Sequence, residues 1–439
     1  MKNWKSAFSM LVLAVGVFAC LQSFAPAKIE RSRVIKKDFD GKPSVAALHQ
    51  FGPLVVKKSA DNKVHLIAEM LVTGNDEEDI EAVLGRFDIE VRESASALEL
   101  KTDLGIESCN NINGKTTVKY RDGFKVKGVN SYKVNMTLEL PNTEKLELQN
   151  KYDKIEIQDD FNGSLRVDLY SGELLAANLG YLDLDLKYGK AKIGNLGKGD
   201  LKVYDSELRT GNAQSLRVDS KYSEYELGNV AGNIELKTYD EHWKMGNVSG
   251  SLTLDDKYSD FVFGNIGNAK MVVYDAEFKA EQVGNLEITD SKYSEYKLSN
   301  VGDMKLRSIF DDDYRIGSAK SVVVTDSKYS EFRIQQLEKQ FRIEHSFDDA
   351  VVLEQVSAGF SQIGFDGKYT ELKLKIAEGA NFGFDFNQKY GNVKYPEKQV
   401  KTQFYVDKNG EITIKGSVGS EGSENLLKVT GFDNTVVWE

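Results

Sequence analysis

The sequence contains little proline and little cysteine. Its 439 residues include five prolines and two cysteines. The prolines are Pro26, Pro43, Pro53, Pro141 and Pro396, so residues 142–395 contain none. Proline cannot donate a backbone hydrogen bond, and a strand that is paired on both sides has no place for it. So long a proline-free segment suits a continuous sheet.

The chain also lacks an excess of positive charge. It has 57 Lys and Arg against 68 Asp and Glu, which gives a formal net charge of -11. No global positive field attracts phosphate backbones, so the charge disfavours general nucleic-acid binding. With 41% hydrophobic and 28% charged residues, the composition is that of a folded protein and not of a disordered one.

The first residues have the pattern of an export signal. Lys2 and Lys5 precede an apolar run at 8–20, and the small residues Ala25 and Ala27 follow. This predicts a secretory signal peptide over 1–27, with cleavage after Ala27. Lipidation of Cys20 and an uncleaved anchor are the alternatives. Cleavage leaves Cys109 as the single cysteine of an exported protein, in the periplasm or at the cell surface, without an internal disulfide.

A short repeat fills the proline-free segment. Gly-Asn turns recur every 17 to 19 residues, and this register extends to about fourteen repeats. Within each repeat apolar residues alternate with polar ones, which is typical of strands. A repeat of this length cannot enclose a core alone, whereas stacked repeats bury their apolar columns together. The sequence therefore predicts an all-β, single-stranded β-helix or solenoid.

Three columns of the repeat are almost wholly apolar. Counted from the Gly position of each turn, they lie three residues before it, one before it and two after it. We expect them to form the core. Their members include Leu208, Tyr225, Trp243, Phe261, Phe278, Tyr296, Tyr314 and Phe332 in the first column, Leu227 and Met245 in the second, and Val230 and Val248 in the third.

The repeat also suggests a division of the chain. We expect the signal peptide at 1–27, a β-rich N-terminal cap with one short helix at 28–140, the solenoid at 141–396 and a C-terminal β cap at 397–439. The helix is expected over 75–86, with Asn75 as its N-cap. A solenoid needs its open ends covered against strand pairing, which is the reason for the caps.

Two polar columns carry tyrosine. Seven and six residues before the Gly position, aromatic rings alternate with Lys in one column and with Asp in the next. We interpret this as corner packing with cation–π contacts. A tyrosine-rich edge is also the candidate contact surface for an unknown surface protein or a polysaccharide. The candidate residues are Tyr204, Tyr222, Tyr239, Tyr258, Tyr274, Tyr293 and Tyr329. The Asn of each Gly-Asn turn is expected to take a left-handed conformation and to form a ladder.

Catalytic and metal motifs are missing. The four histidines are dispersed, and no HExxH, GxSxG, phosphate loop or paired-cysteine spacing occurs. An acidic column from Glu207 to Glu331 runs beside a basic one from Arg209 to Arg333, which predicts a salt-bridge ladder rather than a calcium site. We expect no enzyme activity, no cofactor and no metal, and we expect Cys109 to be a buried small residue.

Several segments resemble a known family. They are Phe39–Gly52 (FDGKPSVAALHQFG), the NDEEDI at 75–80, the FDIEV at 87–91 and the repeated Gly-Asn-Val turns. Together they are similar to the "putative adhesin" domains of exported Gram-negative proteins, a family of unknown function. The resemblance implies a β-helix with a surface or periplasmic binding role. Such proteins are often encoded near sigma factors, which implies the alternative of a partner in envelope-stress signalling.

The sequence thus favours an exported, non-enzymatic scaffold that binds surface polymers or proteins. A periplasmic partner of an envelope-stress system is the second hypothesis, and a carbohydrate-active β-helix enzyme is the third. The ligand, the handedness of the helix and the oligomeric state are left open by the sequence.

Overall fold

The structure is a computed structural model that describes residues 28–102, 104–112, 115–420 and 422–439. The predicted signal peptide and Cys20 lie outside these residues. The chain forms two compact units, which are described separately. One comprises Ile67–Glu90, Thr102–Asn135 and the segment ending at Lys36, and the other comprises Lys37–Leu66, Val91–Lys101 and Met136–Glu439. Strand accounts for 73% of the chain, so the all-β class is confirmed.

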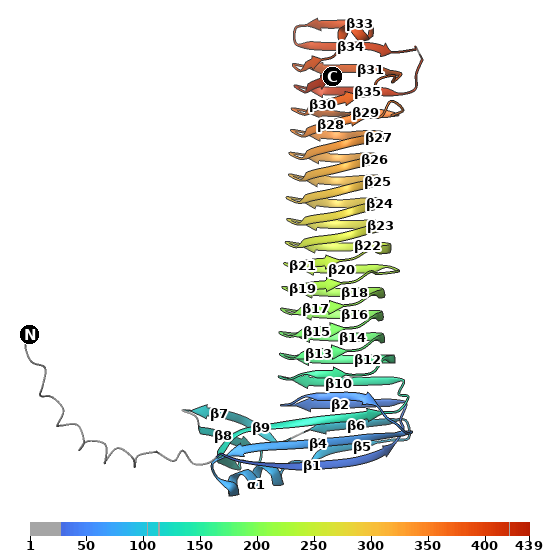
Figure 1. Cartoon of the computed structure of the whole chain (residues 1–439). Coiled ribbons are helices and arrows are strands. Elements are labelled where there is room, and N and C mark those ends of the chain that lie inside the picture. Colours follow the sequence, from blue (N-terminus) through green and yellow to red (C-terminus); the bar gives the residue numbers. More distant parts are fainter. Residues whose placement is uncertain (1–27, 103, 113–114, 421) are drawn as a thin grey trace, which may run out of the picture. The chain divides into compact units, whose positions relative to one another are not determined.

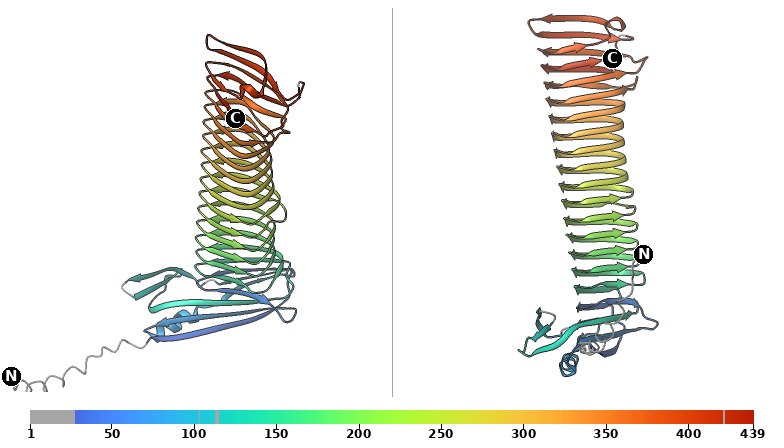
Figure 2. Two further views of the ribbon diagram at one scale, coloured as in Figure 1. Left: turned by 45° about the horizontal axis from the view of Figure 1, so that its top comes forward. Right: turned by 60° about the vertical axis from the view of Figure 1, so that its left-hand side comes forward.

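The larger unit is a β-solenoid of about 13 coils of roughly 18 residues each, which confirms the predicted fold (Figure 1). One coil consists of a long strand, a tight corner, a short strand and a Gly-Asn turn. The strands β14 (Leu179–Lys187) and β15 (Lys190–Ile193) form such a coil, and β16 (Leu196–Tyr204) begins the next. Long strands pair in parallel with long strands and short with short, as the stacked arrows in Figure 2 show.

The remaining strands of the solenoid unit follow the same order. In the first part the short and long strands are separate: β2 (Ser44–Gln50), β3 (Leu54–Lys58), β6 (Ala97–Thr102), β10 (Lys145–Lys151), β11 (Ile155–Ile157), β12 (Phe161–Tyr170), β13 (Glu173–Ala176), β17 (Glu207–Thr210), β18 (Ala213–Lys221), β19 (Glu224–Leu227), β20 (Ile234–Tyr239), β21 (His242–Met245) and β22 (Val248–Lys257). Next, each short strand runs on into the following long one: β23 (Asp260–Tyr274), β24 (Glu277–Lys292), β25 (Glu295–Phe310), β26 (Asp313–Lys328) and β27 (Glu331–Phe347). The last elements are β28 (Ala350–Val356), β29 (Gln362–Lys368), β30 (Glu371–Ile376), β31 (Phe382–Lys389), β32 (Asn392–Lys394), the short 3-10 helix η1 (Glu397–Gln399), β33 (Lys401–Lys408), β34 (Glu411–Val418), β35 (Leu426–Phe432) and β36 (Thr435–Trp438).

The core lies along the axis of the coils, as the three apolar columns predict. The first column is buried throughout, with Phe278, Tyr296 and Tyr314 at 0% exposure. The residues one before and two after the Gly position are also buried, among them Ile334 and Val248. Because side chains alternate along each strand, the charged residues between these columns face outward. The inward and outward assignment of the repeat is confirmed.

The stack begins earlier in the chain than Pro141. The strands β2 and β3 form a coil that pairs in parallel with β10 and β11. Pro43 and Pro53 lie next to the first residues of β2 and β3, and each uses its carbonyl oxygen as an acceptor, for Lys145 and Met136 respectively. Proline is tolerated at this place because no ladder donor is needed there. Part of the segment assigned to the cap is therefore a coil.

The C-terminal tail also differs from the expected cap. The strand β35 pairs in parallel with β29 on one side and β31 on the other, and β36 does the same between β30 and β32. The last residues thus complete a coil inside the stack. Beyond it, β34 pairs antiparallel with β31 and with β33 around the Asn409-Gly410 turn, both with positive φ. This hairpin lies in the segment expected to form the C-terminal cap, and it covers the end of the stack.

The smaller unit contains the helix α1 (Glu77–Gly85), which the sequence predicts. Its N-cap is Asp76 instead of Asn75: the Asp76 carboxylate accepts from the backbone N–H groups of Glu78 and Asp79. The strands β7 (Ile106–Ile112) and β8 (Lys115–Tyr120) pair antiparallel with each other, and β8 pairs with β9 (Lys125–Leu140). The strands β1 (Ile29–Asp40), β4 (Lys63–Gly74), β5 (Ile89–Glu93) and β9 contribute residues to both units.

Candidate binding surface

The seven candidate tyrosines belong to one continuous row of rings on the corners of the coils. We call this row the aromatic ladder. Its ring centroids are 5.3 to 5.9 Å apart, and neighbouring rings are inclined by 73° to 89°. In order, the ladder comprises Tyr152, Tyr170, Tyr188, Tyr204, Tyr222, Tyr239, Tyr258, Tyr274, Tyr293, Phe310, Tyr329, Phe347, Tyr369, Phe432 and Tyr390.

The rings of the ladder occupy two backbone positions in turn. In one coil the ring is on the last residue of the long strand, as in Tyr239. In the next coil it is on the following residue, as in Tyr258, whose φ of 68° is left-handed. Rings at one position in every coil would stack face to face about 4.8 Å apart, which the aromatic quadrupole disfavours. The shift by one residue makes every contact edge-to-face, and it explains the two-coil period of the sequence.

Two expectations about the corners are wrong. The left-handed residues are the ladder tyrosines that follow a long strand, such as Tyr258, and the aspartates at the same position of other coils, such as Asp240, and not the asparagines of the Gly-Asn turns. Likewise, rings contact rings instead of cations: among the described residues, Lys389 over Tyr390 is the single cation–π contact of the ladder. Both errors have one cause, which is the tight corner at the end of each long strand. The left-handed residue lies in this corner, and the backbone there turns neighbouring rings toward each other.

The asparagines of the Gly-Asn turns do form a ladder. Each side-chain Oδ1 accepts from the backbone N–H of the asparagine in the next coil, at 2.7 Å from Asn178 to Asn195 and 2.9 Å from Asn195 to Asn212. The ladder continues at 2.7 to 2.9 Å as far as Asn265. These contacts satisfy the turn backbone, which supports the structural interpretation of this column.

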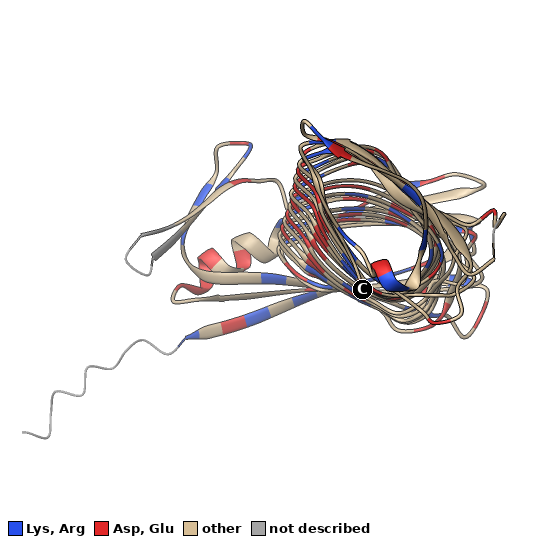
Figure 3. Ribbon diagram, turned by 90° about the horizontal axis from the view of Figure 1, so that it is seen from above, with Lys and Arg blue, Asp and Glu red and all other residues tan. Residues whose placement is uncertain are grey.

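The charged columns form the predicted ladder of ion pairs. Lys297 Nζ lies 2.6 Å from Glu277 Oε1 and 2.9 Å from Glu295 Oε2, and Arg315 joins Glu295 to Asp313 at 2.6 Å each. Hydrogen bonds from Lys279 and Lys297 lower the pKa of Glu277 to about 2. Viewed along the coils, both acidic and basic residues lie on the strands of the solenoid (Figure 3). Glu277, Glu295 and Asp313 are thus each paired with a lysine or an arginine, which leaves little attraction for a calcium ion.

A groove of about 680 Å³ lies beside the ladder where the cations are fewer. Its walls carry the rings of Tyr188 and Tyr222 together with several carboxylates and a lysine. The lining acids and bases are Asp205, Glu207, Glu224, Asp240, Lys190 and His242. Tyr204 is 36% exposed and Tyr222 is 45% exposed, so both rings and hydroxyl groups are accessible at this corner.

A row of buried polar residues, which was not predicted from the sequence, lies just inside the corner. Glu241 is 1% exposed and accepts a 2.6 Å hydrogen bond from Ser220, while Asp312 accepts from the Ser294 backbone and from Tyr314. Burial raises the pKa of Glu241 to about 8 and that of Asp312 to about 7. Between Ser206 and Asp349, the residue after the left-handed one is Ser, Asp or Glu in every coil except at Ala276, and this was the available signal. Removal from water favours the protonated acids, so this row is part of the core.

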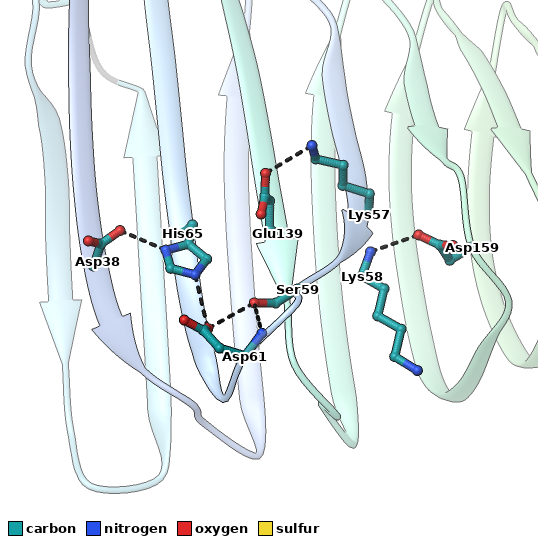
Figure 4. Close-up of polar contacts among 8 residues, drawn as sticks. All are labelled: Asp38, Lys57, Lys58, Ser59, Asp61, His65, Glu139 and Asp159. Atoms are coloured by element: carbon teal, nitrogen blue, oxygen red, sulfur yellow. Dashed lines mark hydrogen bonds and ion pairs between the residues drawn. The ribbon is translucent and has the colours of Figure 1, made fainter.

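The most conspicuous cluster around a histidine does not have catalytic geometry (Figure 4). His65 Nδ1 lies 2.8 Å from Asp38 and its Nε2 lies 3.0 Å from Asp61. These hydrogen bonds raise the pKa of His65. The hydroxyl of Ser59 donates to Asp61 and not to the imidazole. Both ring nitrogens are engaged by carboxylates, so the cluster holds two strands together and provides no activated nucleophile.

Cys109 is not the buried small residue that was expected from the sequence. Cys109 is exposed on β7, and desolvation raises the pKa of its thiol, which keeps it in the less nucleophilic form.

In the described part of the chain, no three His, Cys, Asp or Glu side chains are grouped to hold a metal ion. Nor does any described helix have the length and apolar character to cross a membrane.

Comparison with solved structures gives weak likenesses. A "putative adhesin" from Bacteroides fragilis is 18% identical, over 63% of this chain and 96% of that one, with a TM-score of 0.25. A "putative cell adhesion protein" from Clostridium sporogenes is 10% identical, over 93% and 99%, with a TM-score of 0.17. A "putative adhesin" from Parabacteroides merdae is 14% identical, over 79% and 92%, with a TM-score of 0.21.

Likenesses at these TM-scores carry no argument about function. The fold is established by the strand pairing of the chain itself. No family model matches the sequence, and no curated protein matches it either.

Proposed function

We propose that this chain is an exported, non-enzymatic scaffold that binds a protein or polysaccharide of the cell envelope through the aromatic ladder. The observation that carries the proposal is the ladder itself. It runs along the coils and keeps its tyrosines accessible, with Tyr152 58% exposed and Tyr293 46% exposed. Tyrosine combines a large rigid apolar area with a hydroxyl group at low cost in conformational entropy, which suits recognition.

The ladder is already ordered before any partner arrives. Each ring between the two ends of the ladder contacts two neighbouring rings, and the corner backbones are hydrogen-bonded to the next coil, as from Tyr222 N to Tyr239 O at 3.0 Å. A partner would therefore pay little to immobilise these side chains. The groove lined by Tyr188 and Tyr222 offers carboxylates beside the rings, so a partner that brings hydroxyl or basic groups would be favoured.

The export and the location are part of the proposal and need their own test. Intact cells that express the protein should be treated with a protease that does not enter the periplasm, and loss of the full-length chain should be followed by immunoblotting. We expect cleavage if the protein is at the surface. Full protection would overturn the surface-binding proposal and favour the periplasmic partner of a stress-signalling system.

The binding role is tested with a ladder variant. Tyr222→Ser, Tyr258→Ser and Tyr293→Ser combined should reduce adhesion of the purified mature protein to envelope material at least tenfold. The matched control is Tyr405→Ser, because Tyr405 is 58% exposed but lies on β33, away from the ladder. Equal adhesion by the ladder variant and the control would overturn the proposal.

A further inference from the structure

A second groove runs across the long strands of the later coils. It has a volume of about 640 Å³ and is lined by residues of β22 to β27. One polar side chain per coil lies along it in exact parallel register, so the spacing is that of the strands, about 4.8 Å. The row comprises Ser251, Asn268, Asn285, Asp303, Ser321 and Gln340. We call it the amide groove.

The central row of the amide groove is almost uncharged, in contrast to the ion-pair columns of the short strands. Five of its six central side chains are amides or hydroxyls, and the carboxylate of Asp303 is paired with Lys320 at 3.0 Å. Asn285 Nδ2 donates to Asn268 Oδ1 at 2.7 Å. This leaves the amide N–H groups of Asn268 and the carbonyl oxygen of Asn285 directed to other partners or to water. The groove offers donors and acceptors in alternation.

The four charged residues that line the groove have formal charges that sum to zero. They are Lys270 and Lys305 against Glu287 and Asp303. Glu287 lies 3.9 Å from Lys270 and 2.9 Å from Arg307, which is outside the groove. A polyanion or polycation therefore finds no complementary field here. The apolar lining residues Leu252 and Met304 are at most 1% exposed, so an apolar partner finds little surface to bury.

A peptide strand is also a poor occupant. Strand addition requires a free sheet edge, and the long strands of β23 to β26 are paired with a coil on both sides. What remains is an extended ligand that is neutral, rich in hydroxyl groups and regular in its repeat. A linear polysaccharide has these properties, and its sugar units advance by a length similar to the spacing of the coils.

We infer that the amide groove binds a neutral linear polysaccharide that lies along the axis of the solenoid. The inference rests on the proposed binding function and names the ligand class and a second surface for it. Each sugar unit would meet one amide or hydroxyl group, and binding would sum several modest hydrogen bonds instead of one strong site. Affinity should then rise with chain length up to the number of coils spanned.

The test uses the mature protein and soluble polysaccharides in affinity gel electrophoresis. The probes are linear β-glucan and mannan as neutral chains, with dextran sulfate as the anionic comparison. The variant is Asn268→Asp with Asn285→Asp, which replaces amide donors with like charges. The control is Gln282→Glu, an exposed amide of the same coil as Asn285 that lies outside the groove. Circular dichroism and thermal melting confirm that both variants fold.

We expect at least one neutral chain to retard the protein, the groove variant to bind it at least tenfold more weakly, and the control to bind as the parent does. Retention of full affinity by the groove variant would overturn the inference, as would preference for dextran sulfate or binding to none of the neutral chains. The ladder variant separates the two proposals. If it loses adhesion to envelope material while the groove variant keeps it, the aromatic ladder functions and the amide groove does not.

Discussion

The solenoid carries two rows of aromatic rings, one inside and one outside, and they pack differently. In the inner row Tyr225 and Trp243 are inclined by 5°, and Tyr296 and Tyr314 by 3°. In the outer row, the aromatic ladder, every pair is close to perpendicular, as for Tyr204 and Tyr222 at 89°. The coil spacing is the same for both. The difference is that the inner rings recur at one position in each coil, whereas the outer rings alternate between two.

The spacing of the aromatic residues in the sequence therefore sets the angle at which neighbouring rings pack. Inside, rings at equal positions are inclined by angles from 3° between Tyr296 and Tyr314 to 47° between Phe278 and Tyr296, and they lie in a closely packed core. Outside, no such packing exists, so the rings gain stability from each other through edge-to-face contacts. The one-residue shift is what permits this arrangement.

The largest expected effect comes from breaking the inner row. Phe261→Ala removes a ring that is 1% exposed and contacts Trp243 and Phe278. We expect the free energy of unfolding to fall by about 3–5 kcal/mol, as for other large-to-small core substitutions. Chemical denaturation monitored by circular dichroism measures it. A loss below about 1 kcal/mol would contradict the placement of this column in the core.

The next effect depends on pH and concerns the polar row beside the inner rings. Glu241 has a pKa of about 8 in the folded chain against an ordinary value of 4.5. The folded state therefore holds a proton that the unfolded state releases between these values, so stability falls as pH rises through this window. Glu241→Gln should reduce this fall, by an amount on the order of a few kcal/mol.

Thermal melting of the parent and the Glu241→Gln variant at pH 5 and pH 8.5 is the measurement. From pH 5 to pH 8.5, the melting temperature of the parent should fall further than that of the variant. Asp312 stays in both proteins and accounts for part of the remaining dependence, because its pKa is raised to about 7. Parallel pH profiles would show that Glu241 is not held protonated.

A smaller effect tests the shift in the outer row. Lys257→Tyr combined with Tyr258→Lys keeps the composition but places the new ring directly opposite Tyr239 and Tyr274. Two edge-to-face contacts, each worth about 0.5–1.5 kcal/mol, are replaced by face-to-face stacking. We expect a loss of about 1–3 kcal/mol by denaturation. A swapped protein as stable as the parent would show that the alternation has no energetic role.

The smallest effect is expected on the outward charged face. Glu224 is exposed on β19, between the ladder and the turn. Glu224→Gln should change the free energy of unfolding by less than about 0.5 kcal/mol, as is usual for surface positions. The same denaturation experiment measures it. A loss comparable to that of Phe261→Ala would mean that the inward and outward columns are exchanged.

Much of this architecture could be predicted because the relevant rule is local. Side chains alternate along a strand, so Phe261 and Glu224 could be assigned to opposite faces from spacing alone. The hairpin at Asn409-Gly410 could be predicted for the same reason, since the turn residues carry the signal. The candidate tyrosines could be named from their columns, and their role in binding is still a prediction.

Other features depend on neighbours that are distant in sequence. Phe432 joins the ladder between Tyr369 and Tyr390, because the tail enters the stack between earlier coils. The pair Phe432-Asp433 repeats the corner pattern of Phe347-Asp348, and this was the signal that could have shown it. The exposure of Cys109 and the register of the amide groove likewise follow from pairing across the sheet.

The period, the strand type and the inward and outward columns follow from the sequence alone, because they depend on the alternation of side chains within one coil. Which coils are neighbours, how rings on successive corners meet and which carboxyl groups are removed from water depend on the folded chain. Those properties arise between coils, where the distance and orientation of side chains are set by the parallel pairing of strands and not by any local pattern.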